Sequence, residues 1–236
     1  MLEVTDVCKG FSPKNPKVLS DVSFTVNKGE AVALVGENGA GKTTLIRILS
    51  LVFKPDSGSV SLSGVNFLKD PEYFKSKTGT LFSGDGSLYD RLSAKENIEY
   101  YALLNGVPKK RYDAMLETLI DELSLSTFLN ERVGNFSRGM KQRTAIARTL
   151  ITDPDFVILD EPSTGLDIIA SESVKRIIAR LKADGKTVLF SSHNIDEIFS
   201  CADRILIIHK GKINCDETIR SFLSERGKDF SAYIKD

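Results

Sequence analysis

Cysteine is scarce in this chain of 236 residues, which contains only Cys8, Cys201 and Cys215. No two of them lie close enough in the sequence to predict a zinc site, and their odd number argues against a disulfide framework. We therefore expect the three to be small residues of the protein core.

An excess of charge of either sign is also missing, because 32 Lys and Arg residues balance 32 Asp and Glu residues. Proteins that bind nucleic acid usually carry a basic excess or a basic patch. The composition therefore gives no reason to expect nucleic acid as a partner, and none to expect attraction to a charged membrane surface.

Long apolar runs are absent as well. Apolar runs such as 156–159 and 205–208 have the length of a strand, far below the roughly 20 residues that span a bilayer. The first residues lack the basic and then apolar pattern of a signal peptide. We expect a protein of the cytoplasm that does not itself cross the membrane.

The composition is otherwise that of a globular protein, with 41% hydrophobic and 27% charged residues. A chain of this length can bury a full core. The sequence has no tandem repeat and no sustained heptad, which excludes a solenoid and a long coiled coil. A single compact domain is expected.

Strand patterns dominate the beginning of the chain. Residues 18–26 alternate between apolar and polar, and residues 31–35 form a continuous apolar run that leads into a glycine-rich loop. Helical spacing of apolar residues follows over 43–52. The pattern predicts a unit of strand, loop and helix.

The middle of the chain has helical patterns instead. Ser93 and Glu96 are spaced as a capping box that opens a helix through about residue 104, and another helix is expected over 109–123. We interpret residues 84–150 as a helical subdomain.

After this region, strands and helices alternate. Strands are expected at 156–159 and 187–191 with a helix near 168–183 between them, and 205–209 with 212–215 form an expected hairpin. Alternation of this kind predicts a parallel sheet with crossover helices, and hence an α/β fold.

The segment 36–43, G-E-N-G-A-G-K-T, fits the phosphate-loop pattern G-x-x-x-x-G-K-[ST] between a strand and a helix. Backbone N–H groups of such a loop and the helix N-terminus bind phosphate oxygens. Lys42 is expected to reach the β- and γ-phosphates, and Thr43 the Mg²⁺ ion. A phosphate loop alone leaves kinases, GTPases and many ATPases open. The nucleotide-binding residues expected here are Gly36, Asn38, Gly39, Ala40, Gly41, Lys42, Thr43 and Thr44.

Two carboxylates, Asp160 and Glu161, follow the apolar run at 156–159. The carboxyl ends of parallel strands form the edge where ligands bind. Asp160 is expected to hold Mg²⁺ through water, and Glu161 to act as general base for the attacking water. An isolated Asp-Glu pair would more often be a solvated helix start. His193 follows another apolar strand, where it can contact the γ-phosphate, although a lone histidine is more often a structural hydrogen bonder.

Three segments complete a set of motifs: S-R-G-M-K-Q-R at 137–143, D-E-P-S-T-G-L-D at 160–167 and S-S-H at 191–193. In this order after the phosphate loop, they resemble the nucleotide-binding subunits of ATP-binding-cassette (ABC) transporters, over nearly the whole chain. The resemblance implies an α/β P-loop NTPase with a mostly parallel core sheet, an N-terminal antiparallel β subdomain and an inserted α-helical subdomain. The ATP-binding core would comprise residues 1–83 and 151–236, around the helical signature subdomain at 84–150.

The same resemblance implies a head-to-tail dimer, for which two identical chains are the simpler default. Ser137 and Gly139 of one subunit would close on the γ-phosphate held by Lys42 of the other. Asp167 is similar to the residue that signals between the two sites. Phe11 is similar to the aromatic residue that stacks on adenine, with packing in a core or loop as the alternative.

The function implied by the resemblance is ATP hydrolysis, with Mg²⁺, that drives a membrane-spanning permease on a separate chain. This chain would lie at the inner face of the cell membrane through its permease. The chain departs from the family pattern in two places. The signature reads F-S-R-G-M at 136–140 instead of L-S-G-G-Q, and Gly84 stands at the place of a glutamine that contacts Mg²⁺. Both departures resemble the branch of sodium, drug and peptide-antibiotic exporters and favour export over import.

Two other classes of function are weighed against this one. A soluble cassette ATPase that acts on nucleic acid or the ribosome usually has coiled-coil insertions or two cassettes, which this chain lacks, and a neutral charge argues against it. A regulatory subunit with weak ATPase activity is suggested only by Gly84 and Met140, while Lys42, Glu161 and His193 argue for hydrolysis.

Overall fold

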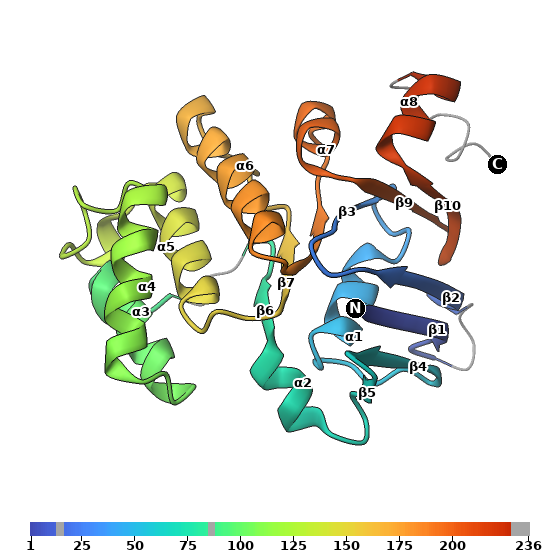
Figure 1. Ribbon diagram of the computed structural model, residues 1–236, viewed down its shortest axis with the longest axis horizontal. Helices are drawn as coiled ribbons and strands as arrows, with labels where there is room; N and C mark the ends of the chain where they lie inside the picture. The colour runs from blue at the N-terminus through green and yellow to red at the C-terminus, as the bar shows by residue number, and fades with distance from the viewer. Residues whose placement is uncertain (13–16, 85–87, 228–236) are drawn as a thin grey trace.

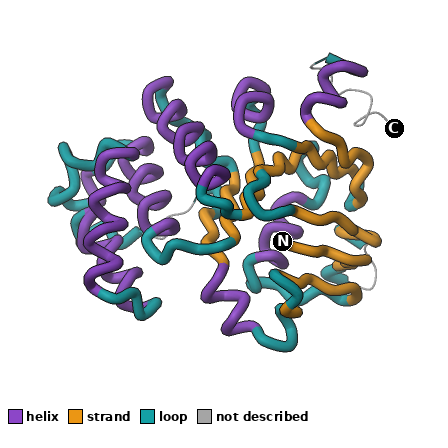
Figure 2. The backbone as a smooth tube through the Cα atoms, viewed as in Figure 1, coloured by secondary structure: helices purple, strands orange, loops and turns teal. Residues whose placement is uncertain are grey.

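The computed structural model describes residues 1–12, 17–84 and 88–227, which form two sheets and a set of helices (Figure 1; Figure 2). The larger sheet has six strands in the order β10-β9-β3-β8-β7-β6. Five of them run parallel, and β10 pairs antiparallel with β9 as the expected hairpin. The strands are β3 (Ala31–Val35), β6 (Thr78–Leu81), β7 (Phe156–Asp160), β8 (Thr187–Ser191), β9 (Arg204–His209) and β10 (Lys212–Thr218).

The second sheet is antiparallel and comes from the N-terminal part of the chain, with the order β2-β1-β4-β5. The mostly parallel sheet and this antiparallel sheet together confirm the predicted α/β fold class. Its strands are β1 (Leu2–Lys9), β2 (Leu19–Val26), β4 (Ser57–Leu62) and β5 (Val65–Asn66).

Helices lie on both faces of the larger sheet, and α3, α4 and α5 form a group at one end of the molecule (Figure 1). The bounds of this group agree with the patterns in the middle of the sequence. The helices are α1 (Lys42–Leu49), α2 (Pro71–Lys77), α3 (Ala94–Leu104), α4 (Lys109–Glu122), α5 (Arg138–Leu150), α6 (Ile168–Ala183), α7 (Ile195–Cys201) and α8 (Ile219–Arg226), with a short 3-10 turn at Val133–Asn135.

The central strands are buried on both faces, which explains why their sequences are continuous apolar runs. Successive side chains of a strand point to opposite faces. In β3, Val32 and Leu34 face a core shared with α1 and the antiparallel sheet, whereas Ala33 and Val35 face a core shared with the helices of the middle and later chain. The sheet thus separates two cores.

Serine side chains cap the starts of α3, where the capping box was expected, and of α5. Ser93 and Glu96 form a capping box at α3, in which the Glu96 carboxylate accepts a hydrogen bond from the Ser93 N–H (2.7 Å). Ser137 caps α5 by accepting from the Met140 N–H at 3.3 Å. The cysteines are buried as expected, with exposed fractions of 2% to 5%.

The helix expected over 43–52 ends earlier, at Leu49. Leu51 adopts a left-handed backbone conformation with φ of 61°, which turns the chain away from the helix axis. Val52, placed on the apolar helix face by its spacing, is instead 55% exposed. Among the helices in the described ranges, none has both the length and the apolar character needed to span a bilayer.

The two sheets are joined at Arg204, whose side chain is 13% exposed. Its guanidinium forms ion pairs with Glu30 (2.6 Å) and Asp216 (2.5 Å) and donates to the Thr25 carbonyl of β2. Replacing Arg204 with alanine leaves the largely buried Glu30 carboxylate without its cation. Removal of one partner of a largely buried pair typically destabilises a protein by about 3 kcal/mol.

We therefore expect Arg204→Ala to lower the free energy of unfolding, measured in urea, by about 3 kcal/mol. Lys109→Ala, which removes the exposed pair of Lys109 with Asp113, serves as the control and should change it by less than about 1 kcal/mol. Equal effects of the two substitutions would contradict the proposed role of the Arg204 contacts.

Candidate functional site

The loop between β3 and α1 is shaped by its glycines. Gly41, directly before α1, has φ of 114°, a conformation that side-chain-bearing residues rarely adopt. Gly36 packs so closely on β9 that an added Cβ would lie 2.3 Å from the Ile208 carbonyl oxygen. The N–H groups at the start of α1 have no side-chain cap, so they are available to an anionic ligand.

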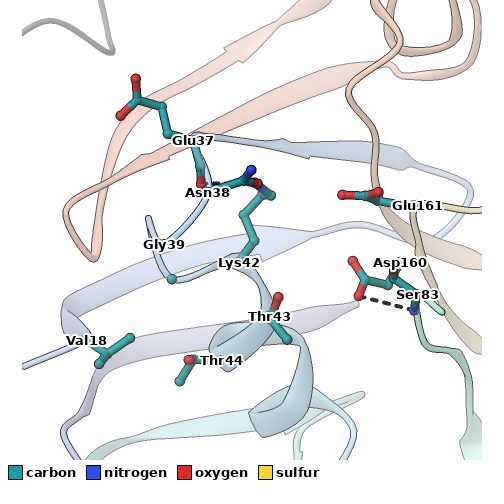
Figure 3. A pocket seen from close by; sticks show the side chains of 11 residues that line it. Val18, Glu37, Asn38, Gly39, Lys42, Thr43, Thr44, Ser83, Asp160 and Glu161 are labelled. Carbon is teal, nitrogen blue, oxygen red and sulfur yellow. Dashed lines mark hydrogen bonds between the residues drawn. The ribbon is translucent and has the colours of Figure 1, made fainter. Parts of the chain in front are cut away.

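A cavity of about 210 Å³ lies over this loop (Figure 3). It brings together most of the predicted nucleotide-binding loop with the carboxylates at the end of β7. Gly36 and Ala40 shape the loop without lining the cavity. The lining residues are Val18, Glu37, Asn38, Gly39, Gly41, Lys42, Thr43, Thr44, Ser83, Asp160 and Glu161.

Lys42 points back over the loop, where its Nζ donates to the carbonyl oxygens of Gly36 (2.5 Å) and Glu37 (3.1 Å). Burial lowers the pKa of Lys42, while the nearby carboxylates of Glu161 and Asp160 act in the opposite direction. The cation is therefore held between the loop and two carboxylates, where an anionic phosphate can take over its contacts.

Asp160 is the last residue of β7 and only 6% exposed. Its Oδ1 accepts from the Ser191 hydroxyl at 2.6 Å and its Oδ2 from the Ser83 N–H at 3.3 Å (Figure 3 shows the latter). Thr43 lines the same cavity. A hydroxyl and a carboxylate are oxygen donors of the kind that Mg²⁺ prefers.

Glu161 turns away from Asp160 because its backbone is left-handed, with φ of 51°. Its N–H donates to the Ser191 hydroxyl (2.9 Å), which fixes this unusual conformation. Both carboxylate oxygens have partners: His193 Nε2 lies 2.9 Å from Oε1, and the Thr164 hydroxyl donates to Oε2 at 3.0 Å. The structure thus brings Glu161 and His193 into direct contact.

The other predicted residues lie outside the cavity lining. Ser137 and Gly139 start α5, and Asp167 caps α6 by accepting from the Ala170 N–H at 2.8 Å. Phe11 is 57% exposed and packs edge-on against Phe53, with ring centroids 5.4 Å apart. Within one chain, the signature residues therefore do not join the phosphate loop.

Sequence reasoning did not anticipate the groups that hold the carboxylates, namely the backbone N–H of Ser83 and the hydroxyls of Thr164 and Ser191. Ser191 was visible only as part of the S-S-H motif. The signal for the two hydroxyls is a serine or threonine shortly after a strand-end carboxylate, as with Thr164, or at the end of another apolar strand, as with Ser191, because short hydroxyl side chains can donate to carboxylates.

Gly84 has φ of 68°, and an added Cβ would meet no atom within 4 Å. It lies at the edge of a second cavity that also includes Thr43 and Asp160. The glycine in place of the usual glutamine thus leaves open space beside the predicted Mg²⁺ residues.

Comparison with known proteins shows the family to which the chain is similar. Residues 19–164 match the family model described as "ABC transporter". The ABC transporter ATP-binding protein NatA of Bacillus subtilis is 41% identical over 234 residues, which cover 98% of this chain and 95% of the relative. The bacitracin transport ATP-binding protein BcrA of Bacillus licheniformis is 36% identical over 214 residues, 90% of this chain and 68% of the relative.

A solved structure with the same fold is a dimeric, post-hydrolysis state of the ATP-binding cassette MJ0796 bound to ADP and phosphate. It superposes with a TM-score of 0.83 at 25% identity and covers 93% of this chain and 99% of that one. With the phosphate loop and the strand-end carboxylates in one cavity, these matches identify the chain as a member of the ABC transporter family, an ATP-binding subunit that hydrolyses ATP to drive transport.

Proposed function

We propose that this subunit hydrolyses ATP with the residues that converge at the carboxyl ends of β3, β7 and β8, and that it works as a dimer beneath a separate permease. The observation that carries the proposal is the shared cavity of Lys42, Thr43, Asp160 and Glu161, with His193 in contact with Glu161. In this arrangement the phosphates would have the loop N–H groups and Lys42 on one side and Glu161 on the other.

The phosphate loop and Lys42 would hold the β- and γ-phosphates, and Thr43 with Asp160 would hold Mg²⁺, Asp160 through water. When bound, Mg²⁺ neutralises negative charge on the phosphates. The fixed orientation of Asp160, set by Ser191 and Ser83, supports this assignment. Gly84 supplies no side chain here, so the donors proposed for the ion are a hydroxyl, a carboxylate and water.

Glu161 would accept a proton from the attacking water as general base, because its carboxylate lies at the edge of the phosphate cavity. The contact of His193 Nε2 with Oε1 and the bond from Thr164 to Oε2 direct this carboxylate. His193 is half exposed and is free to reach toward the γ-phosphate when ATP occupies the cavity.

The proposed dimer is supported by what one chain leaves incomplete. Ser137 and Gly139 lie outside the phosphate cavity of their own chain, so they can complete a site only on another copy. The N-terminus of α5 offers uncapped N–H groups beyond the one that Ser137 caps, and these suit a γ-phosphate. Asp167 would mediate between the two sites, and Phe11 would stack on adenine with its exposed ring.

The permease would dock at a groove of about 490 Å³ lined by Tyr89, Asp90, Arg91, Leu92 and Tyr100. The rings of Tyr89 and Tyr100 are 54% and 41% exposed and stand edge to face at 5.3 Å. The buried Asn97 fixes the loop by hydrogen bonds to the Tyr89 N–H and carbonyl oxygen. This groove belongs to the helical unit proposed at 84–150, of which residues 85–87 lie outside the described part.

Export is the proposed direction, and the inner face of the cell membrane the proposed location. The signature F-S-R-G-M and Gly84 support export through their resemblance to the exporter branch. The bacitracin transport protein, which shares 36% identity, is consistent with a cargo of the antibiotic class.

Glu161→Gln removes the base but keeps the shape of the side chain. We expect ATP hydrolysis to fall by about 10² to 10⁴-fold, the usual loss for a general base, while ATP binding persists because the phosphate loop is intact. Light scattering should then show an ATP-dependent dimer. A variant that hydrolyses ATP normally, or that stays monomeric with ATP, would contradict the proposal.

Tyr100→Asp places a charge in the docking groove without touching the phosphate cavity. A polytopic membrane protein should copurify with the tagged wild-type chain from mild detergent at near-equal abundance, and should be lost with Tyr100→Asp, as measured by mass spectrometry. Leu103→Asp is the matched control, because Leu103 lies on the same helix, is 69% exposed and does not line the groove. Recovery of only soluble proteins or nucleic acid with the wild-type chain would refute the permease proposal.

A further inference from the structure

A buried glutamate lies behind the Glu161 and His193 pair and has no part in the mechanism above. Glu197, in the first turn of α7, is only 1% exposed. None of the ion pairs found among the described residues involves it. An ionised carboxylate is unfavourable in the interior unless hydrogen bonds replace its hydration. Its hydrogen-bond partners therefore indicate what this residue does.

Each carboxylate oxygen of Glu197 accepts a hydrogen bond from a different loop. The Ser163 hydroxyl donates to Oε1, and the Ser192 hydroxyl donates to Oε2. Ser163 lies two residues after Glu161, and Ser192 directly precedes His193. Hydrogen bonds from hydroxyls to a carboxylate are among the stronger ones in proteins. One buried side chain thus joins the two loops that carry the proposed hydrolytic pair.

The bridge is itself held in place. Ser192 Oγ accepts from the Asn194 N–H at 3.0 Å, which leaves its proton directed toward Glu197. Asn194 also caps α7, with its Oδ1 accepting from the Glu197 N–H at 3.3 Å. The backbone of Glu197 and the hydroxyl of Ser192 are consequently both tied to Asn194.

The ends of β7 and β8 form a second link between the two loops. Glu161 is bonded through its N–H to the Ser191 hydroxyl and to the Ser191 carbonyl oxygen. The pairing of β7 with β8 thus links the two loops where they begin, and Glu197 links them again beyond that point. The 2.9 Å contact between His193 and Glu161 lies between these two constraints.

We infer that Glu197 is a positioning residue for ATP hydrolysis, which sets the relative placement of Glu161 and His193 by joining Ser163 to Ser192. The inference rests on the roles proposed for Glu161 and His193. Misplacement of reacting groups by about 1 Å can slow a reaction by about 10²-fold. Loss of the bridge therefore affects turnover, whereas nucleotide binding depends on the separate phosphate loop.

The test compares kcat and KM for ATP in the complex of this chain with its membrane partner. Glu197→Ala should lower kcat by about 10-fold or more, with KM changed by less than about 2-fold. Glu197→Gln should retain most of kcat, because an amide can accept from one hydroxyl and donate to the oxygen of the other. Ser163→Ala with Ser192→Ala should reproduce the loss, and adding Glu197→Ala to that pair should lower kcat no further.

Glu122→Ala is the matched control, because it removes a largely buried carboxylate of α4 that pairs with Arg180, remote from the phosphate loop. It should leave kcat unchanged. If Glu197→Ala does not fold, the single serine variants carry the test, since each removes one hydroxyl and leaves the glutamate one partner. Normal kcat in both would overturn the inference.

The inference would also be overturned if the effects of Glu197→Ala and the serine variants were additive, or if kcat and nucleotide affinity fell together. Glu161→Gln is measured in parallel to separate the two proposals. Full activity of Glu161→Gln would refute the hydrolytic pair itself. An inactive Glu161→Gln beside a fully active Glu197→Ala would refute only the positioning role of Glu197.

Discussion

The arrangement of the whole site depends on the close pairing of the carboxyl ends of β7 and β8. Ser191 ends β8, and its hydroxyl both donates to Asp160 and accepts from the N–H of Glu161. One hydroxyl group therefore fixes the orientation of the carboxylate proposed for Mg²⁺ and the backbone of the proposed base. Because Glu161 has a left-handed backbone, the two adjacent carboxylates have different hydrogen-bond partners.

The edge formed by the carboxyl ends of the central strands carries the site because each of these strands is buried on both faces, with a helix or sheet against either side. The strands place their alternate side chains in two separate cores, and the polar residues are confined to the strand ends, where backbone groups and water remain accessible. At this edge Lys42 and Asp160 are largely removed from water and still line an open cavity together with Glu161.

The sequence predicted the sheet type, the phosphate loop and the adjacent carboxylates because these depend on local pattern. The run 31–35 and the motif at 36–43 lie within one unit of strand, loop and helix, and the strand at 187–191 matched β8 in full.

The end of α1 was wrong by three residues, since the left-handed Leu51 is not encoded in apolar spacing. Short elements such as β6, with Gly79 in a four-residue strand, and the seven-residue α7 carry too few residues to show a period. The contacts of Glu197 with Ser163 and Ser192 could not be predicted, because they join residues whose proximity exists only in the folded sheet.

Arg138, the arginine in the signature, contacts the loop that follows β7. The guanidinium of Arg138 lies against Gly165, where an added Cβ would stand 2.6 Å from Cζ, and the Gln142 amide donates to the Pro162 carbonyl oxygen at 2.8 Å. The first turns of α5 are therefore in contact with the loop that begins at Glu161. Gly165 has φ of 75°, a backbone conformation that favours glycine. The start of α5 and the loop of the proposed base are thus linked through Arg138 and Gln142, and the Ser163 hydroxyl of the same loop donates to Glu197. The arginine at the place of the usual first glycine thus adds a side-chain contact between the start of α5 and the loop of the proposed base, which a glycine could not make.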